Sequence, residues 1–324
     1  MFGIILSLIF LSSVTVSPKI SDLSTGSTTR AVTNQREMKP GHKKKDITQE
    51  IESLFSKFHG QAGLYVHNLK TGETIEINAD SLFPTASMIK VPIMVRLYDM
   101  MNKGTYRYDQ KFTYDGNHDY PYEPDLINTS KLGAEIPLSY LIHIMISMSD
   151  NSAALWCQYL AGGGIEINKW LEQHGFKYLR MNSRTPGREA EYKEFGWGVT
   201  TPRELSELVT QIYKGEVVSK AASDQMYRTM SRSMWDGEAL SQIPNYVNAA
   251  SKQGAVDEAR SEVVLVNAPH GDYVFCIATK NQSDTSWTYD NEGYVLIREV
   301  SHLLWQHFEP KSKWKPDPEL KKYW

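Results

Sequence analysis

Strand-like segments lie at both ends of a long helical stretch in this chain of 324 residues. Near the start, GLYVHNLKTGETIEINA (63–79) alternates apolar and polar residues around a KTGE turn, which is typical of two antiparallel strands. Strand patterns return at 248–254, 261–268 and 272–280, whereas about 87–232 has a helical pattern. We therefore predict an α/β (α+β) fold, in which an antiparallel sheet of strands from both termini is flanked by helices beside an all-helical lobe. A functional site should lie between sheet and lobe.

A lysine lies in the most apolar helix-like segment beyond the N-terminus, PTASMIKVP (84–92). Its neighbours leave almost no polar face, and a buried lysine needs a partner or a chemical role. If a helix begins near Ser87, then Ser87 and Lys90 share one face and the amine can reach the hydroxyl. Desolvation would lower the pKa of Lys90, so that it could act as a base near neutral pH. S-x-x-K alone is a common pattern, which a lysine reaching toward solvent also produces.

Two further segments suit the same chemistry. Ser149, Asp150 and Asn151 occupy a short break between two helical segments, and Lys252 and Gly254 begin a late strand. Ser-Asp-Asn can cap a helix in any protein, and a lysine can begin any strand. Three such motifs in this order are far less expected by chance than one, and S-x-x-K, S-D-N and K-T-G together mark class A β-lactamases and penicillin-binding proteins.

The chain resembles class A β-lactamases and related penicillin-recognising serine hydrolases over about residues 47–307, most specifically in S-M-I-K and M-S-D-N-S-A-A. The resemblance implies a serine acyl hydrolase that opens β-lactam amides through an acyl-serine intermediate. The implied roles are nucleophile for Ser87, base for Lys90, proton relay for Ser149, substrate amide binding for Asn151, and positive charge near Ser149 and the substrate carboxylate for Lys252. The oxyanion hole would be the main-chain N–H groups of Ser87 and Ala255, which follows Gly254. Asp150 is expected to be structural and to hold its turn.

The third motif departs from the family pattern, because Gln253 stands where threonine or serine is usual. The hydroxyl expected to bind the substrate carboxylate is thus replaced by a longer amide, which changes the expected substrate preference. Arg260 on the next strand is an alternative group for the carboxylate, although strand arginines are more often surface residues.

A second departure concerns deacylation, for which class A enzymes position a water with an E-x-x-L-N loop. The corresponding segment, SRTPGREAEYKEFGWGV, has no such motif, and Pro186 stands where the glutamate would fall. Glu189, Glu191 and Glu194 are the candidate bases there, although a glutamate-rich loop is usually only solvated. Deacylation can therefore be slow, since it needs a water held by a group of suitable pKa.

Three alternatives remain open at this point. A D-alanyl-D-alanine carboxypeptidase or penicillin-binding protein would also be acylated, and would act on its own peptide. A non-hydrolytic sensor would stay acylated and would need a membrane segment, and a glutaminase of this fold would not be exported. Tyr120 and Tyr122 are candidates for an aromatic wall at the mouth of the site.

The ends of the chain differ from its centre. Residues 1–17 are uncharged and apolar, which predicts a signal peptide or an N-terminal anchor, and hence a periplasmic or secreted protein. A flexible basic linker (18–46), the hydrolase domain (47–307) and a C-terminal tail (308–324) follow. The net charge is −3 and the basic residues collect at the two ends of the chain. Nucleic acid binding by the acidic centre is therefore not expected, whereas the basic ends could be attracted weakly to an anionic envelope surface.

The two cysteines, Cys157 and Cys276, lie in apolar segments and are expected to be buried free thiols. The nine histidines are scattered, and no metal-ligand spacing occurs, so neither a metal nor another cofactor is expected. The expected ligand is a small β-lactam or a peptide ending in D-alanyl-D-alanine.

Overall fold

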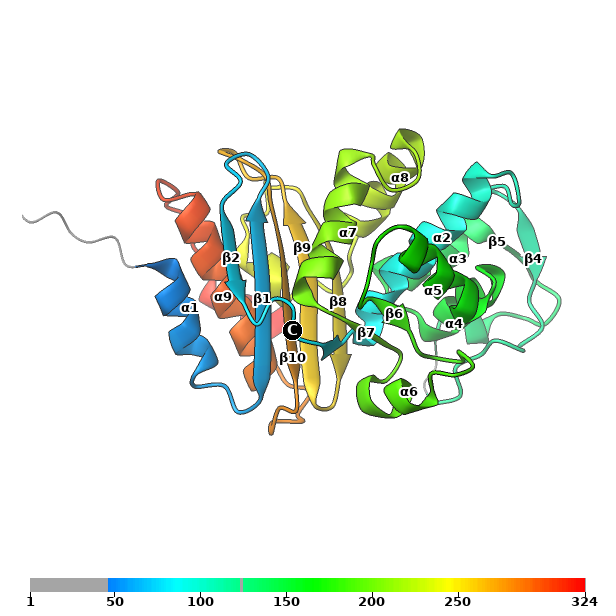
Figure 1. Ribbon diagram of the computed structural model, residues 1–324, viewed down its shortest axis with the longest axis horizontal. Coiled ribbons are helices and arrows are strands. Elements are labelled where there is room, and N and C mark those ends of the chain that lie inside the picture. The colour runs from blue at the N-terminus through cyan, green and yellow to red at the C-terminus, as the bar shows by residue number, and fades with distance from the viewer. Residues whose placement is uncertain (1–45, 123–124, 324) are drawn as a thin grey trace, which may run out of the picture. The chain divides into compact units, whose positions relative to one another are not determined.

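The computed structural model describes residues 46–122 and 125–323. Its main sheet has five antiparallel strands in the order β2-β1-β10-β9-β8 (Figure 1). These are β1 (Gln61–Asn68), β2 (Thr74–Ile77), β8 (Ala249–Val256), β9 (Ala259–Val266) and β10 (Tyr273–Lys280). Pairing of β1 with β10 joins the early hairpin to the late strands, from Gln61 opposite Lys280 to Asn68 opposite Tyr273. The predicted sheet with strands from both ends of the sequence is confirmed.

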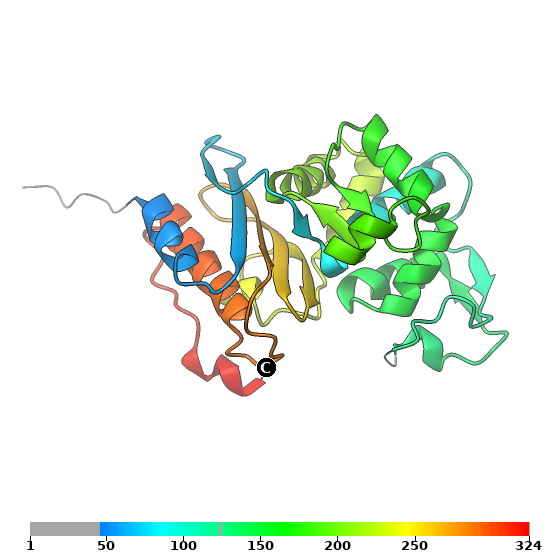
Figure 2. The ribbon, with the colours of Figure 1, turned by 60° about the horizontal axis from the view of Figure 1, so that its bottom comes forward.

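The two faces of this sheet carry separate apolar cores. In Figures 1 and 2, α1 (Ile47–Phe55) and α9 (Glu292–Phe308) cover one face and α7 (Pro202–Lys214) crosses the other. Successive side chains of a strand point to opposite faces, so Val264 of β9 packs toward α9 while Val263 packs toward α7 and the helical lobe. Burial of both faces explains the unbroken apolar run in this strand.

The helical lobe supplies the second, larger core. Its helices are α2 (Lys90–Asn102), α3 (Leu138–Ser147), α4 (Asn151–Leu160), α5 (Gly163–Gln173), α6 (Glu189–Phe195) and α8 (Lys220–Met230), with a short 3₁₀ turn at η2 (Ile127–Thr129). A second 3₁₀ turn, η3 (Ala239–Gln242), packs against α9 on the other face of the sheet. Fully buried residues such as Ile93, Met94 and Leu141 pack between these helices.

Two small sheets have strands within, or just before, the stretch of about 87–232 that the sequence predicts to be helical. One joins β3 (Phe83–Pro84), β7 (Gly198–Thr200) and β6 (Arg180–Met181), and the other joins β4 (Lys111–Thr113) and β5 (Glu135–Pro137). Strands of two or three residues leave no alternation in a sequence, which is why the prediction lacks them. The pairing of β3 with β7 ties the segment before Ser87 to the glutamate-rich loop.

The helix that carries Lys90 begins later than predicted. A 3₁₀ turn, η1 (Ala86–Ile89), follows β3, and α2 starts at Lys90. Ala86 has a φ of 41°, so the chain turns sharply just before Ser87. Residues three apart are eclipsed in a 3₁₀ helix, so Ser87 and Lys90 still share one side of the turn.

Residues after α9 pack onto the sheet side of the molecule. The buried Glu309 carboxylate accepts the main-chain N–H of His270 at 2.8 Å, and Lys321 of η4 (Pro318–Tyr323) pairs with Asp290 at 2.5 Å. In the described residues, no helix has the length and apolarity needed to cross a membrane. The predicted signal or anchor (1–17), and the predicted linker up to residue 45, lie outside the described residues.

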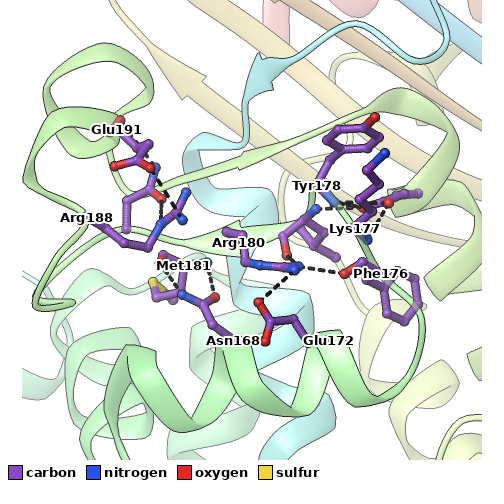
Figure 3. A network of polar contacts seen from close by, with 12 residues as sticks. Asn168, Glu172, Phe176, Lys177, Tyr178, Arg180, Met181, Arg188 and Glu191 are labelled. Atoms are coloured by element: carbon purple, nitrogen blue, oxygen red, sulfur yellow. Dashed lines mark hydrogen bonds and ion pairs between the residues drawn. The ribbon is translucent and has the colours of Figure 1, made fainter.

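A buried carboxylate fixes the segment between α5 and β6. Glu204, in the first turn of α7, accepts the main-chain N–H groups of Lys177, Tyr178 and Leu179 at 2.6 to 3.1 Å. Figure 3 shows Arg180 beside this segment, pointing toward the carbonyl of Phe176 and the carboxylate of Glu172. The segment that leads through β6 into the glutamate-rich loop is therefore anchored to two helices.

We expect Glu204→Ala to lower the free energy of unfolding by about 2 to 3 kcal/mol, because three N–H groups lose a charged acceptor. Chemical denaturation followed by circular dichroism measures the change. Glu207→Ala is the matched control, since Glu207 lies exposed on the same helix. Equal effects of the two substitutions would contradict this assignment.

Candidate active site

Lys90 is buried and bonded to the break between α3 and α4. Its Nζ donates to the carbonyl oxygen of Ser149 at 2.5 Å, to Ser149 Oγ at 3.1 Å and to Asn151 Oδ1 at 2.7 Å. Ser149 has a φ of 62°, a left-handed conformation that lets the short break present carbonyl and hydroxyl together. The structure thus brings the first two predicted motifs together, with Ser87 half-buried at the preceding turn.

Lys252 approaches the same hydroxyl from the sheet. Its Nζ donates to Ser149 Oγ at 3.1 Å and to the carbonyl and side-chain oxygens of Gln253, each at 2.8 Å. Burial, and next the charge of Lys90, hold the pKa of the Lys252 amine well below its usual value, while the carboxylates of Glu262 and Glu238 oppose this shift. Two amines that share one buried hydroxyl disfavour double protonation of the pair.

The free edge of β8 faces the turn of Ser87. A Cβ added to Gly254 would lie 2.4 Å from the Thr85 carbonyl oxygen and 3.0 Å from Ser87 N, so only glycine permits this approach. Arg260, opposite Ala255, directs its N–H and carbonyl toward Thr279 of β10. In an antiparallel pair, two directly opposed residues either bond to each other through both N–H and C=O groups or both direct these groups away from each other. Because those of Arg260 point away from β8, those of Ala255 point away from β9, toward the free edge of the sheet. The Ala255 N–H therefore lies on the edge that approaches Ser87 N.

The suggestion that Arg260 binds a carboxylate at this site is wrong. Successive residues of β9 lie on opposite faces of the sheet, and Arg260 lies on the face opposite to that of Lys252. Its guanidinium is on the α9 side, 4.8 Å from the Tyr294 ring centroid and 4.4 Å from that of Trp287. There it donates to the main-chain carbonyl oxygens of Ala259 and Ser286. The strand register, which the sequence does not reveal, determines this direction.

The three loop glutamates occupy different surroundings on α6. Glu194 is exposed, and Glu191 pairs with Arg188 at 3.6 Å, as Figure 3 shows. Glu189 lines the cavity described below, but its own main-chain N–H and that of Gly187 hold the pKa of its carboxyl below the usual value, which makes it a weaker base. Among the described contacts, none joins these carboxylates to Lys90 or Ser149.

A cavity of about 660 Å³ lies between the glutamate-rich loop and the loop that contains Tyr120. Its lining includes Tyr120, Tyr122, Leu155, Glu189, Tyr192 and Trp197. Tyr120 meets Tyr122 and Trp197 edge-on, with ring centroids 5.3 and 5.7 Å apart. Trp197 is a residue of this site that the sequence analysis does not identify. The one local feature that marks it in the sequence is its position between two glycines.

Asp150 holds its turn, as predicted. Its carboxylate accepts the N–H groups of Ala153, Leu126 and Ile127, and burial raises the pKa of this carboxyl. The neighbouring Ser152 adds a second tie, because its hydroxyl accepts the N–H of Tyr120 at 2.8 Å. The predicted aromatic wall is thereby anchored to the S-D-N break.

Both cysteines are buried free thiols, as predicted, and burial raises the pKa of each. Within residues 46–122 and 125–323, no cluster of three or more histidine, cysteine, aspartate or glutamate side chains could hold a metal ion.

Comparison with known proteins agrees with this geometry. The profile of the β-lactamase enzyme family matches residues 46–308. β-Lactamase VEB-1 of Pseudomonas aeruginosa is 20% identical over 273 residues, which are 81% of this chain and 90% of that protein.

Solved structures show the same fold. PBP-A is 27% identical with a TM-score of 0.73, over 82% of this chain and 96% of its own, and a variant of it is known as an acyl-enzyme complex with penicillin G. A class A β-lactamase of Mycobacterium abscessus is 19% identical with a TM-score of 0.72, over 81% and 99%. The chain therefore belongs to the β-lactamase enzyme family and is a serine hydrolase of the class A type.

Proposed function

We propose that β-lactam amides acylate Ser87 rapidly and that the acyl group leaves slowly. The observation that carries this proposal is the Ser149 hydroxyl, which lies 3.1 Å from the amines of both Lys90 and Lys252. These groups supply the proton transfers of acylation, whereas the described contacts of Glu189 and Glu191 lead to Gly187 and Arg188, and Glu194 is exposed.

In the proposed acylation, Ser87 Oγ attacks the lactam carbonyl carbon and its proton passes to the neutral amine of Lys90. The N–H groups of Ser87 and Ala255 receive the negative charge that develops on the carbonyl oxygen. The C–N bond then breaks, and the nitrogen takes a proton from Ser149 Oγ, which a neighbouring ammonium replaces. Asn151 would bind the substrate amide, and Lys252 with Gln253 would meet the carboxylate.

A D-alanyl-D-alanine carboxypeptidase is the second candidate. PBP-A, among the relatives compared, has the higher identity, and the loop of this chain has Pro186 where class A enzymes have their glutamate. Such a peptidase would be acylated by penicillins and would hydrolyse its peptide.

We further propose that residues 1–17 direct export to the periplasm or beyond and that the basic linker lies near an anionic envelope surface. Nucleic acid is not among the partners that we propose for this protein.

We expect Lys90→Arg to slow acylation by about 10² to 10⁴, because a guanidinium stays protonated and cannot accept the serine proton. Stopped-flow labelling with a fluorescent penicillin gives the rate constant. Ser87→Ala is the blank and should show no covalent label by mass spectrometry. A wild-type acylation rate in Lys90→Arg would show that Lys90 has only an electrostatic role. A covalent label on Ser87→Ala would contradict the acyl-serine mechanism.

We expect Gly254→Val to weaken both acylation and stability, because its side chain would push β8 away from the turn of Ser87. The loss of stability should be about 1 to 3 kcal/mol. Val256→Ala, at the exposed end of the same strand, serves as control. An unchanged acylation rate in Gly254→Val would contradict the assigned oxyanion edge.

A good β-lactam should give a burst of one acyl group per enzyme and then slow turnover, because a missing general base costs about 10² to 10⁴ in rate. Quenched-flow mass spectrometry separates the two phases. Glu191→Gln and Glu194→Gln should leave the slow phase unchanged, and a slower phase in Glu189→Gln alone would assign Glu189 as the base. Rapid steady-state hydrolysis without a burst would refute slow deacylation, and a parallel assay with a D-alanyl-D-alanine peptide tests the second candidate.

A further inference from the structure

We propose that the indole of Trp197 keeps water away from the acyl ester on the loop side of Lys90. This inference rests on the proposed function and names a physical cause for slow deacylation. It makes Trp197 a shielding residue that acts on the second half of the reaction and leaves the first half intact.

The indole lies against the amine that the reaction uses. Lys90 Nζ is 5.7 Å from the ring centroid of Trp197, within the range of a cation–π contact. The same amine is bonded to Ser149 and Asn151 of the α3–α4 break. The amine thus has polar partners in the α3–α4 break and, among its described neighbours, the aromatic ring of Trp197 from the loop.

Several contacts hold the ring in place. The carbonyl oxygen of Trp197 accepts the N–H groups of Asn182 at 2.8 Å and Ser183 at 3.0 Å, and Tyr120 packs edge-on against the indole. Of the two flanking glycines, Gly198 brings the backbone close to the nucleophile turn. Gly196 has a φ of 68°, and a Cβ on Gly198 would lie 2.6 Å from Ile89 Cδ1.

The ring is also a wall of the aromatic cavity that Glu189 and Tyr192 line. The cavity, of about 660 Å³, has room for several water molecules. Trp197 belongs to this lining and its ring also faces Lys90, so in the proposed role its indole lies between the cavity and the amine. Hydrolysis needs a water oxygen that attacks the ester carbon, gives its proton to a base and releases Ser87 Oγ with a proton. An indole at this place supplies no base and excludes the water.

The test measures acylation and deacylation separately in the full chain, with benzylpenicillin and intact-mass spectrometry. Trp197→Ala should retain the burst of one acyl group and deacylate about tenfold faster or more, since water gains access to the ester. Trp197→Phe, a smaller change that keeps an aromatic ring, should fall between the wild type and Trp197→Ala. Tyr192→Ala is the matched control, because it widens the same cavity without uncovering Lys90, and its deacylation rate should equal that of the wild type.

The outcomes distinguish the two proposals. Absence of a burst in the wild type would overturn the proposed function itself. A normal burst with unchanged deacylation in Trp197→Ala and Trp197→Phe would overturn only the shielding role, as would equal acceleration in Tyr192→Ala. If Trp197→Ala does not fold, Trp197→Phe decides alone, since its deacylation must then exceed the wild-type rate for the inference to stand.

Discussion

The buried amine of Lys90 is the interaction on which the site depends. A lysine amine in an apolar core is costly unless it is bonded, and here Ser149 and Asn151 supply three acceptors. Those bonds hold the start of α2 against the break between α3 and α4, so the same contact supports the helical lobe and arranges the reacting groups. The left-handed Ser149 is tolerated because this contact requires its carbonyl and hydroxyl on one side.

The two halves of the reaction are built on different kinds of structure. Groups for acylation lie on helix starts and on a sheet edge, which buried side chains hold rigidly. The region for deacylation is a loop, fixed at its base by Glu204 and Asn182 and exposed in its outer part, at residues 186–187, 189–190 and 192–194. Loops accept substitutions more readily than cores do, because fewer contacts depend on them. A scaffold of this kind can therefore keep its acylation chemistry while the lifetime of the acyl-enzyme changes.

The sequence predicts the parts of this arrangement that local patterns record. Alternation at 63–79 and in the late strands identifies the sheet, and the spacing of Ser87 and Lys90 survives the change from an α-helix to a 3₁₀ turn. Directions set by tertiary register are not recorded locally, which is why the sequence offers Arg260 for the substrate carboxylate although its side chain lies on the α9 side. Trp197 escapes the sequence analysis for a related reason, because tertiary contacts such as the pairing of β3 with β7 bring the loop beside Lys90.

The close approach at Gly254 has a consequence for the shape of any ligand. β8 is the last strand of the sheet, and the alternation of its pairs with β9 leaves the polar main-chain groups of Gln253 and Ala255 directed outward. Unpaired strand edges invite further strands, and the turn of Ser87 covers only part of this one. An extended acyl chain lying along β8 would meet an acceptor and a donor at sheet spacing. The substrate would then add to the sheet as a short sixth strand. Its affinity would come mainly from main-chain hydrogen bonds, and its side chains would contribute specificity.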